Sequence, residues 1–260
     1  MNQPPSTSNW FVCPRFNPNA EARLFLFPYA GGGPAAFSRW TAEFPDTIEA
    51  WIAHYPGRGS RHNEIPIKQI STLIEKLSEA IQPLLDRPYA FFGHSMDGLV
   101  AFELVKYLRD NDSSQPANLF ISACGAPHLP DPHQPIHTLP DAEFVHALKE
   151  LNGIPSELLD FPEIIEVLLP ALRADFEIVE SYHYIPNEPR LDILIVAYGG
   201  LNDPRISREQ LEGWAMQTNS DFKSIYFPGD HFFINVAKDE IVRSIARELM
   251  SSPAMKDKSA

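Results

Sequence analysis

Residues 91–98 read FFGHSMDG, and they join a short apolar run to a segment with the periodicity of a helix. A serine between a buried strand and a helix lies on a sharp turn that exposes its hydroxyl group, and the usual pattern around such a nucleophile is GxSxG. Ser95 fits this pattern, but Asp97 replaces the second glycine. Because a carboxylate in a crowded turn needs solvent or hydrogen-bond donors, we expect Asp97 to slow catalysis and Asp97→Gly to raise the acylation rate.

The composition of the chain excludes several classes of protein. Its 260 residues suit one domain, and its hydrophobic fraction of 44% suffices for a core. No uninterrupted apolar stretch reaches the roughly 20 residues of a membrane span, and residues 1–9 lack the features of a secretory signal. A net charge of −13 argues against binding to nucleic acid. Cys13 and Cys124 are too few for a disulfide framework, so we expect ordinary thiols in a cytoplasmic protein.

Short apolar runs alternate along the chain with segments of helical periodicity. Buried strands are expected at 23–27, 48–54, 89–92, 119–123, 191–198 and 224–227, and helices at 70–84 and 99–108. This alternation predicts an α/β fold, with a mostly parallel sheet flanked by helices. We expect a single domain, with its core at about 22–124 and 190–250 and polar tails at 1–9 and 251–260.

Residues 125–189 break this alternation. The segment opens with Pro127, Pro130, Pro132, Pro135 and Pro140. Helical patterns follow at 142–151 and 161–176, and we expect Pro170 to interrupt the second. An apolar helical insertion above strand ends predicts a lid over a pocket for apolar chains. A small structural subdomain is the alternative.

Two further polar residues follow predicted strands, as Ser95 does. A serine nucleophile needs a histidine base and a carboxylate that orients the base. Asp203 follows the strand at 191–198, and His231 follows the strand at 224–227. Because ligands gather at the carboxyl ends of parallel strands, we expect Ser95, Asp203 and His231 to form a catalytic triad. Asp192 and Asp230 are weaker candidates, since one begins a strand and the other adjoins the histidine.

An anion-binding site for the reaction needs two backbone N–H groups. Met96 supplies the N–H after the nucleophile, and the glycine-rich loop after the first strand, residues 27–33, supplies the other. That loop lacks the Lys and Ser/Thr of a phosphate-binding loop. The irregular loop that holds His128, His133 and His137 makes a metal site improbable, and we expect His94 to hold the turn.

Five motifs in order resemble those of a type II thioesterase, a stand-alone α/β-hydrolase that accompanies polyketide and nonribosomal peptide synthetases. They are PYAGGG at 28–33, YPGRGSR at 55–61, GHSM at 93–96, GLND at 200–203 and GDHFF at 229–233. The likeness spans about residues 22–247. By resemblance, Ser95, Asp203 and His231 match the triad of the family, and Ala30 and Met96 match its oxyanion-hole positions. Asp97 departs from the Gly or Ala of the family.

The resemblance implies hydrolysis of acyl thioesters on the phosphopantetheine arm of a carrier protein. The family edits blocked carrier domains, needs no cofactor, and is expected here as a monomer. Carrier proteins are usually acidic, so Arg58 and Arg61 are candidates for the mouth of the site, although either could be an ordinary solvated charge. Two alternatives stay open: a carboxylester hydrolase or acyltransferase with the same triad, and a catalytically weakened binding protein of the same fold.

Overall fold

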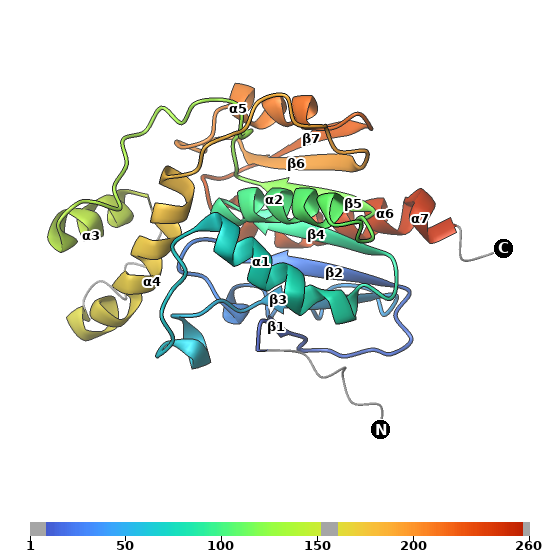
Figure 1. The fold of residues 1–260 in the computed structure, drawn as a ribbon, viewed down its shortest axis with the longest axis horizontal. Coiled ribbons are helices and arrows are strands. Elements are labelled where there is room, and N and C mark those ends of the chain that lie inside the picture. The colour runs from blue at the N-terminus through green and yellow to red at the C-terminus, as the bar shows by residue number, and fades with distance from the viewer. Residues whose placement is uncertain (1–8, 152–160, 257–260) are drawn as a thin grey trace.

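The computed structural model describes residues 9–151 and 161–256, and a seven-stranded sheet lies at the centre of these residues (Figure 1). The strands are β1 Phe11–Val12, β2 Ala22–Phe27, β3 Ile48–Ala53, β4 Tyr89–His94, β5 Asn118–Ser122, β6 Leu194–Gly200 and β7 Phe222–Phe227. Their order across the sheet is β1-β3-β2-β4-β5-β6-β7. β1 is antiparallel to β3, and the remaining pairs are parallel. The predicted mostly parallel α/β fold is confirmed.

Helices cover both faces of the sheet. The helices are α1 Ile70–Ile81, α2 Met96–Asp110, α3 Asp141–Glu150, α4 Pro162–Glu180, α5 Arg208–Glu212, α6 Lys238–Ser251 and α7 Pro253–Lys256. Short 3-10 helices occur at Pro34–Ala36, Gly59–Arg61, Gln82–Leu84, Gly213–Gln217 and Phe233–Asn235. α1 and α2 pack on one face and α6 on the other (Figure 1). Each face has its own apolar core. None of the described helices has the length and apolar character to span a membrane.

The six predicted strands all occur, with ends that lie within three residues of the expected ones. β1 was not predicted, because two residues are too few to show a pattern. The predicted break at Pro170 is wrong, since α4 runs through it. Pro170 is exposed, so water can satisfy the carbonyl group that loses its partner, and the helix continues.

α3 and α4 lie beyond the carboxyl ends of the strands (Figure 1). Both belong to the segment at 125–189. Their shared apolar cluster includes Phe144, Leu148, Ile165 and Leu172, and it is separate from the two cores of the sheet. The first expected helix, at 142–151, corresponds to α3 and extends one residue beyond its end at Glu150. The second, at 161–176, lies within α4 apart from Phe161.

Candidate active site

Ser95 lies on a strained turn between β4 and α2. Its φ of 57° and ψ of −126° are unusual for a residue with a side chain, and its N–H donates to the carbonyl of Ser122 on β5 at 2.7 Å. The turn is so tight that a Cβ atom on Gly93 would come within 2.0 Å of the carbonyl oxygen of Asp97. Only glycine fits at that position, and this tight turn holds the Ser95 hydroxyl above the strand.

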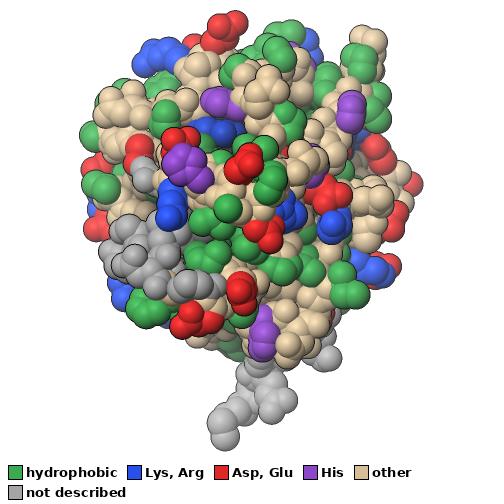
Figure 2. Space-filling view, turned by 90° about the vertical axis from the view of Figure 1, so that its left-hand side faces the viewer, with side chains coloured by type: hydrophobic (Ala, Val, Ile, Leu, Met, Phe, Trp, Pro, Cys, Tyr) green, Lys and Arg blue, Asp and Glu red, His purple; other side chains and the backbone are tan. Residues whose placement is uncertain are grey.

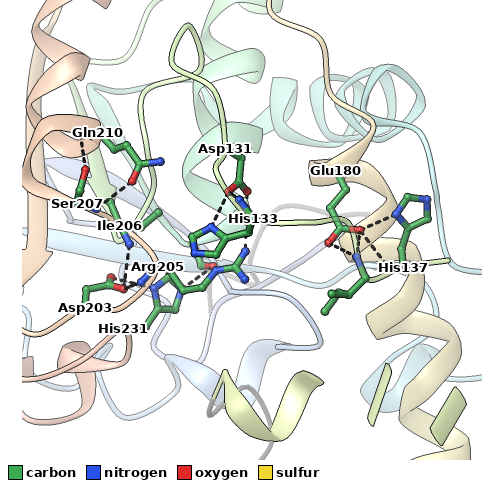
Figure 3. Close-up of polar contacts among 12 residues, drawn as sticks. Asp131, His133, His137, Glu180, Asp203, Arg205, Ile206, Ser207, Gln210 and His231 are labelled. Carbon is green, nitrogen blue, oxygen red and sulfur yellow. Dashed lines mark hydrogen bonds and ion pairs between the residues drawn. The ribbon is translucent and has the colours of Figure 1, made fainter. Parts of the chain in front are cut away.

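The structure brings Ser95, His231 and Asp203 together. His231 Nε2 lies 2.9 Å from Ser95 Oγ, and His231 Nδ1 lies 2.9 Å from Asp203 Oδ2. Figure 3 shows the imidazole of His231 beside the carboxylate of Asp203. Since an ionised carboxylate only accepts hydrogen bonds, the proton of the neutral ring belongs on Nδ1, which leaves Nε2 free to accept the serine proton.

The Asp203 carboxylate is fixed by its own loop. Its Oδ1 accepts hydrogen bonds from the backbone N–H groups of Arg205 at 2.8 Å and Ile206 at 3.2 Å, and its side chain is 1% exposed. The rival acids lie elsewhere: Asp192 is exposed and accepts from Asn219. Asp230 Oδ1 accepts from the N–H of Phe232.

His94 is a structural residue of the turn. Its Nδ1 lies 2.9 Å from the hydroxyl of Ser122, and its buried ring packs against Tyr29, His231 and Phe232. Burial lowers the pKa of His94 well below its usual value. The ring is therefore neutral and supports the position of His231 by packing.

The two predicted anion-binding positions line the same cavity as Ser95 and His231. Met96 is the first residue of α2, where a backbone N–H has no acceptor within the helix and the helix end carries a partial positive charge. Ala30 lies on the loop after β2, and Gly31 beside it has a φ of +73°. The structure thus places both residues on the wall of the cavity that contains Ser95.

Asp97 does not crowd the nucleophile as we expected. Its side chain is fully buried, and its Oδ1 accepts the hydroxyl proton of Tyr55 at 2.5 Å. Burial raises the pKa of Asp97 well above its usual value, which favours the neutral acid. The direction of the side chain toward Tyr55, beyond the end of β3, argues against a carboxylate charge beside the oxyanion. The expected rise of the acylation rate in Asp97→Gly stays a prediction.

Arg58 and Arg61 do not lie at the mouth of the site. Both are buried, and Arg58 forms a two-pronged ion pair with Asp175 of α4. Arg61 pairs with Glu64 and donates to the carbonyl of His54. Arg58 looked like an exposed loop charge because its acidic partner lies 117 residues later in the chain. Arg61 has a partner only three residues away, and its burial is what the sequence did not reveal.

A cavity of about 740 Å³ opens beside Ser95. Most of its lining side chains come from the segment at 125–189, including Leu148, Leu172 and Phe176. Cys124 also lines the cavity, but burial raises the pKa of its thiol to about 12. The thiol is therefore protonated at neutral pH and does not compete with Ser95 as a nucleophile.

The histidines of the Pro-rich stretch have separate partners. The Nδ1 atom of each histidine forms a hydrogen bond with a different residue. The pairs are His128 with Gln217, His133 with Asp131, and His137 with Glu180. Figure 3 shows the last two of these pairs. Within residues 9–151 and 161–256, no group of three or more His, Cys, Asp or Glu side chains is arranged to hold a metal ion.

Tyr55 and Asp175 were missed by the sequence reasoning. Asp175 is buried on the same side of α4 as Ala171, Leu172 and Ile178. An acidic residue at an apolar position of an amphipathic helix indicates a buried partner. The helical spacing of Asp175 from its apolar neighbours could therefore have identified it as a residue of interest. Tyr55 carries no comparable signal, since aromatic residues are common at strand ends.

The chain is similar to known proteins over almost its whole length. The thioesterase domain family matches residues 22–249. The gramicidin S biosynthesis protein GrsT of Aneurinibacillus migulanus is 41% identical over 93% of this chain and 94% of that protein. The medium-chain S-acyl fatty acid synthase thioesterase of Homo sapiens is 31% identical over 94% of this chain and 93% of that protein.

Solved structures agree with these matches. The type II thioesterase BorB from the borrelidin biosynthetic cluster is 30% identical, with a TM-score of 0.86 over 94% of this chain and 98% of that one. The range that the family matches, residues 22–249, spans Ala30, Ser95, Asp203 and His231.

Proposed function

The chain belongs to the thioesterase family, and from this premise we propose that Ser95, His231 and Asp203 hydrolyse acyl thioesters carried on the phosphopantetheine arm of a carrier protein. The relatives named for gramicidin S biosynthesis and for the borrelidin biosynthetic cluster support an editing role, in which blocked carrier arms are freed. The observation that carries the proposal is the position of His231, whose two ring nitrogens lie 2.9 Å from Ser95 and from Asp203.

The geometry supports a two-step reaction. Ser95 Oγ attacks the thioester carbonyl carbon while His231 Nε2 takes the hydroxyl proton, and Asp203 stabilises the imidazolium ion that forms. The backbone N–H groups of Ala30 and Met96 stabilise the oxyanion. The imidazolium ion then gives its proton to the leaving thiol. In the second step His231 Nε2 takes a proton from water as the water oxygen attacks the acyl-serine carbonyl carbon; the bond from that carbon to Ser95 Oγ then breaks, His231 returns the proton to Oγ, and the free acid leaves. These steps need no cofactor.

The described parts of the segment at 125–189 serve as the lid in this proposal, and residues 152–160 lie outside the described residues. The lid side chains Leu148, Leu172, Phe176 and Val179 line the cavity beside Ser95 and offer apolar surface to an acyl chain. Figure 2 looks onto this end of the molecule, where basic, acidic and histidine side chains are intermixed with apolar ones. An acidic carrier would meet the intermixed basic side chains here, since Arg58 and Arg61 are buried.

Oligomeric state and compartment are further parts of the proposal. We propose a monomer, since a single chain with an open face is what carrier docking requires. The free thiols of Cys13 and Cys124 support a reducing compartment such as the cytoplasm.

The test compares carrier-borne thioesters with simple oxygen esters. We expect the wild-type protein to release free acid from acyl-loaded carrier proteins with a large preference over oxygen esters of the same acids, and Ser95→Ala to lose this activity. Equal rates on both substrate types would favour the carboxylester hydrolase. A folded wild-type protein that neither hydrolyses a substrate nor reacts with a serine-directed phosphonate would favour the binding protein.

A further inference from the structure

A buried ion pair links α4 to the loop that carries Ala30. Arg58 Nη1 lies 2.7 Å from Asp175 Oδ2, and Arg58 Nη2 lies 2.8 Å from Asp175 Oδ1. The two side chains are only 4% and 2% exposed. Arg58 lies beyond the end of β3, whereas Asp175 lies in α4, so the pair joins the proposed lid to the core.

The same pair holds the backbone of the glycine-rich loop. Asp175 Oδ2 accepts the N–H of Gly31 at 2.7 Å, and Arg58 Nη1 donates to the carbonyl of Gly32 at 3.2 Å. Gly31 follows Ala30 directly, so a hydrogen bond to its N–H fixes the peptide beside the proposed oxyanion donor. Hydrogen bonds to a charged acceptor are stronger than neutral ones, which suits this positioning role.

Apolar packing reinforces the link. A Cβ atom on Gly31 would come within 2.5 Å of Leu172 Cδ2, so α4 packs directly against the loop. Leu172 also lines the cavity. α4 therefore contacts the loop through one apolar side chain and one carboxylate, which lie about one helical turn apart.

We propose that Asp175 is a positioning residue of the active site: it holds the loop so that the Ala30 N–H faces the oxyanion, and this half of the anion site is complete only while α4 is seated on the core. Arg58 completes the device, because its charge offsets that of Asp175 and prevents the carboxylate from repelling the oxyanion. This inference rests on the proposed function in one respect, the role of Ala30 as an oxyanion donor.

Loss of the Asp175 contact should weaken binding of the transition state and not that of the reactant. A misplaced Ala30 N–H weakens binding of the oxyanion but leaves the cavity that binds the neutral reactant in place. We therefore expect Asp175→Asn, which loses the charge but keeps the size of the side chain, to lower the rate of reaction at Ser95 and to leave reactant binding nearly unchanged.

An alkyl fluorophosphonate tests this without a carrier substrate. For Asp175→Asn we expect the maximal labelling rate at Ser95 to fall about 10²-fold, a loss typical of one missing oxyanion donor, and the half-saturating probe concentration to stay within twofold. Because breaking a buried ion pair can unfold a protein, the second variant is Arg58→Met with Asp175→Leu, which removes both charges. It also lacks the carboxylate at Gly31, so we expect a similar fall.

Glu177→Gln is the matched control. Glu177 lies on the same helix and pairs with Lys68 at 3.1 Å, away from the Gly31 loop. Its labelling rate should stay within twofold of wild type. Wild-type labelling rates in either Asp175 variant, or an equal loss in Glu177→Gln, would overturn the proposal. An unlabelled wild-type protein would count instead against the proposed function, and the carrier hydrolysis assay tests that function separately.

Discussion

The two halves of the proposed anion-binding site are built by different parts of the molecule. Met96 begins a helix that grows directly from the central strand β4, so its N–H is placed by neighbours in the chain. Ala30 lies on a loop whose position depends on Asp175, which binds Gly31 across 144 residues of sequence. One half is thus fixed by a local turn, whereas the other is fixed by tertiary contacts with α4.

The largest expected loss of activity comes from a substitution in the triad that leaves both N–H groups of the proposed anion-binding site in place. Asp203→Asn should lower kcat by about 10⁴-fold, because an amide favours the wrong tautomer of His231. The residual rate above the uncatalysed reaction would then measure what the two N–H groups contribute. Steady-state hydrolysis of an acyl-loaded carrier checks this, with Asp192→Asn as a control that should stay within twofold of wild type. Similar losses in both variants would refute the assignment of the acid.

Breaking the local half should damage the fold itself. Gly93→Ala places a Cβ atom 2.0 Å from a backbone oxygen that cannot move without the first turn of α2. We expect the free energy of unfolding to fall by about 3 kcal/mol or more, with loss of labelling at Ser95. In contrast, Gly125→Ala meets its nearest neighbour at 3.4 Å and should be well tolerated. Urea unfolding of both variants gives the comparison, and equal stabilities would contradict it.

Breaking the tertiary half should affect catalysis more than stability. Gly31→Ala adds a Cβ atom that meets the flexible end of Leu172 at 2.5 Å, at a φ of +73°. The backbone strain should cost about 1–2 kcal/mol, while displacement of α4 should lower kcat roughly 10-fold by the loss of about half of one oxyanion interaction. A stability loss as large as that of Gly93→Ala, with kcat unchanged, would show that contact with α4 does not set the catalytic position of the loop.

The smallest effect concerns Asp97, which follows Met96 in the chain but takes no part in the proposed binding of the oxyanion. Burial raises its folded-state pKa above the ordinary value of 3.8, so the acid is most stabilising at low pH and that contribution is lost as the pH rises toward the folded pKa. Asn does not titrate and keeps an acceptor for Tyr55. Relative to wild type, Asp97→Asn should therefore gain stability above about pH 4, by at most about 1.4 kcal/mol per pH unit.

Unfolding curves between pH 4 and pH 8 check this prediction. The kcat of Asp97→Asn should stay within a few-fold of wild type, because the side chain is directed to Tyr55 and not to the oxyanion. Parallel stability profiles for the two proteins would mean that Asp97 titrates normally.

The sequence predicted residues for both halves of the proposed anion-binding site, but it did not reveal the contact of Asp175 with Gly31 that holds the half at Ala30. A strand, a glycine and a helix that follow one another leave a readable pattern, so Ser95 and Met96 could be placed from residues 91–98 alone. Asp203 and His231 were also found, because parallel strands carry their following loops to one edge of the sheet.

Contacts between distant segments leave a weaker trace. Arg58 looked like a solvated loop charge because its partner, Asp175, comes 117 residues later. Asp97 looked obstructive because its acceptor role for Tyr55 depends on how β3 lies beside the centre of the sheet. In both cases the side chain was identified, but its burial and its partner depend on packing that periodicity does not describe.

The most direct test of the account is to trap the covalent intermediate. Wild-type protein is mixed with an acyl-loaded carrier, quenched in acid within milliseconds to seconds, and mapped by mass spectrometry. The peptide containing Ser95 should gain the mass of the acyl group, and Ser95→Ala should form neither this adduct nor free acid. Release of free acid by Ser95→Ala at the wild-type rate, or an acyl group found on another residue, would contradict it.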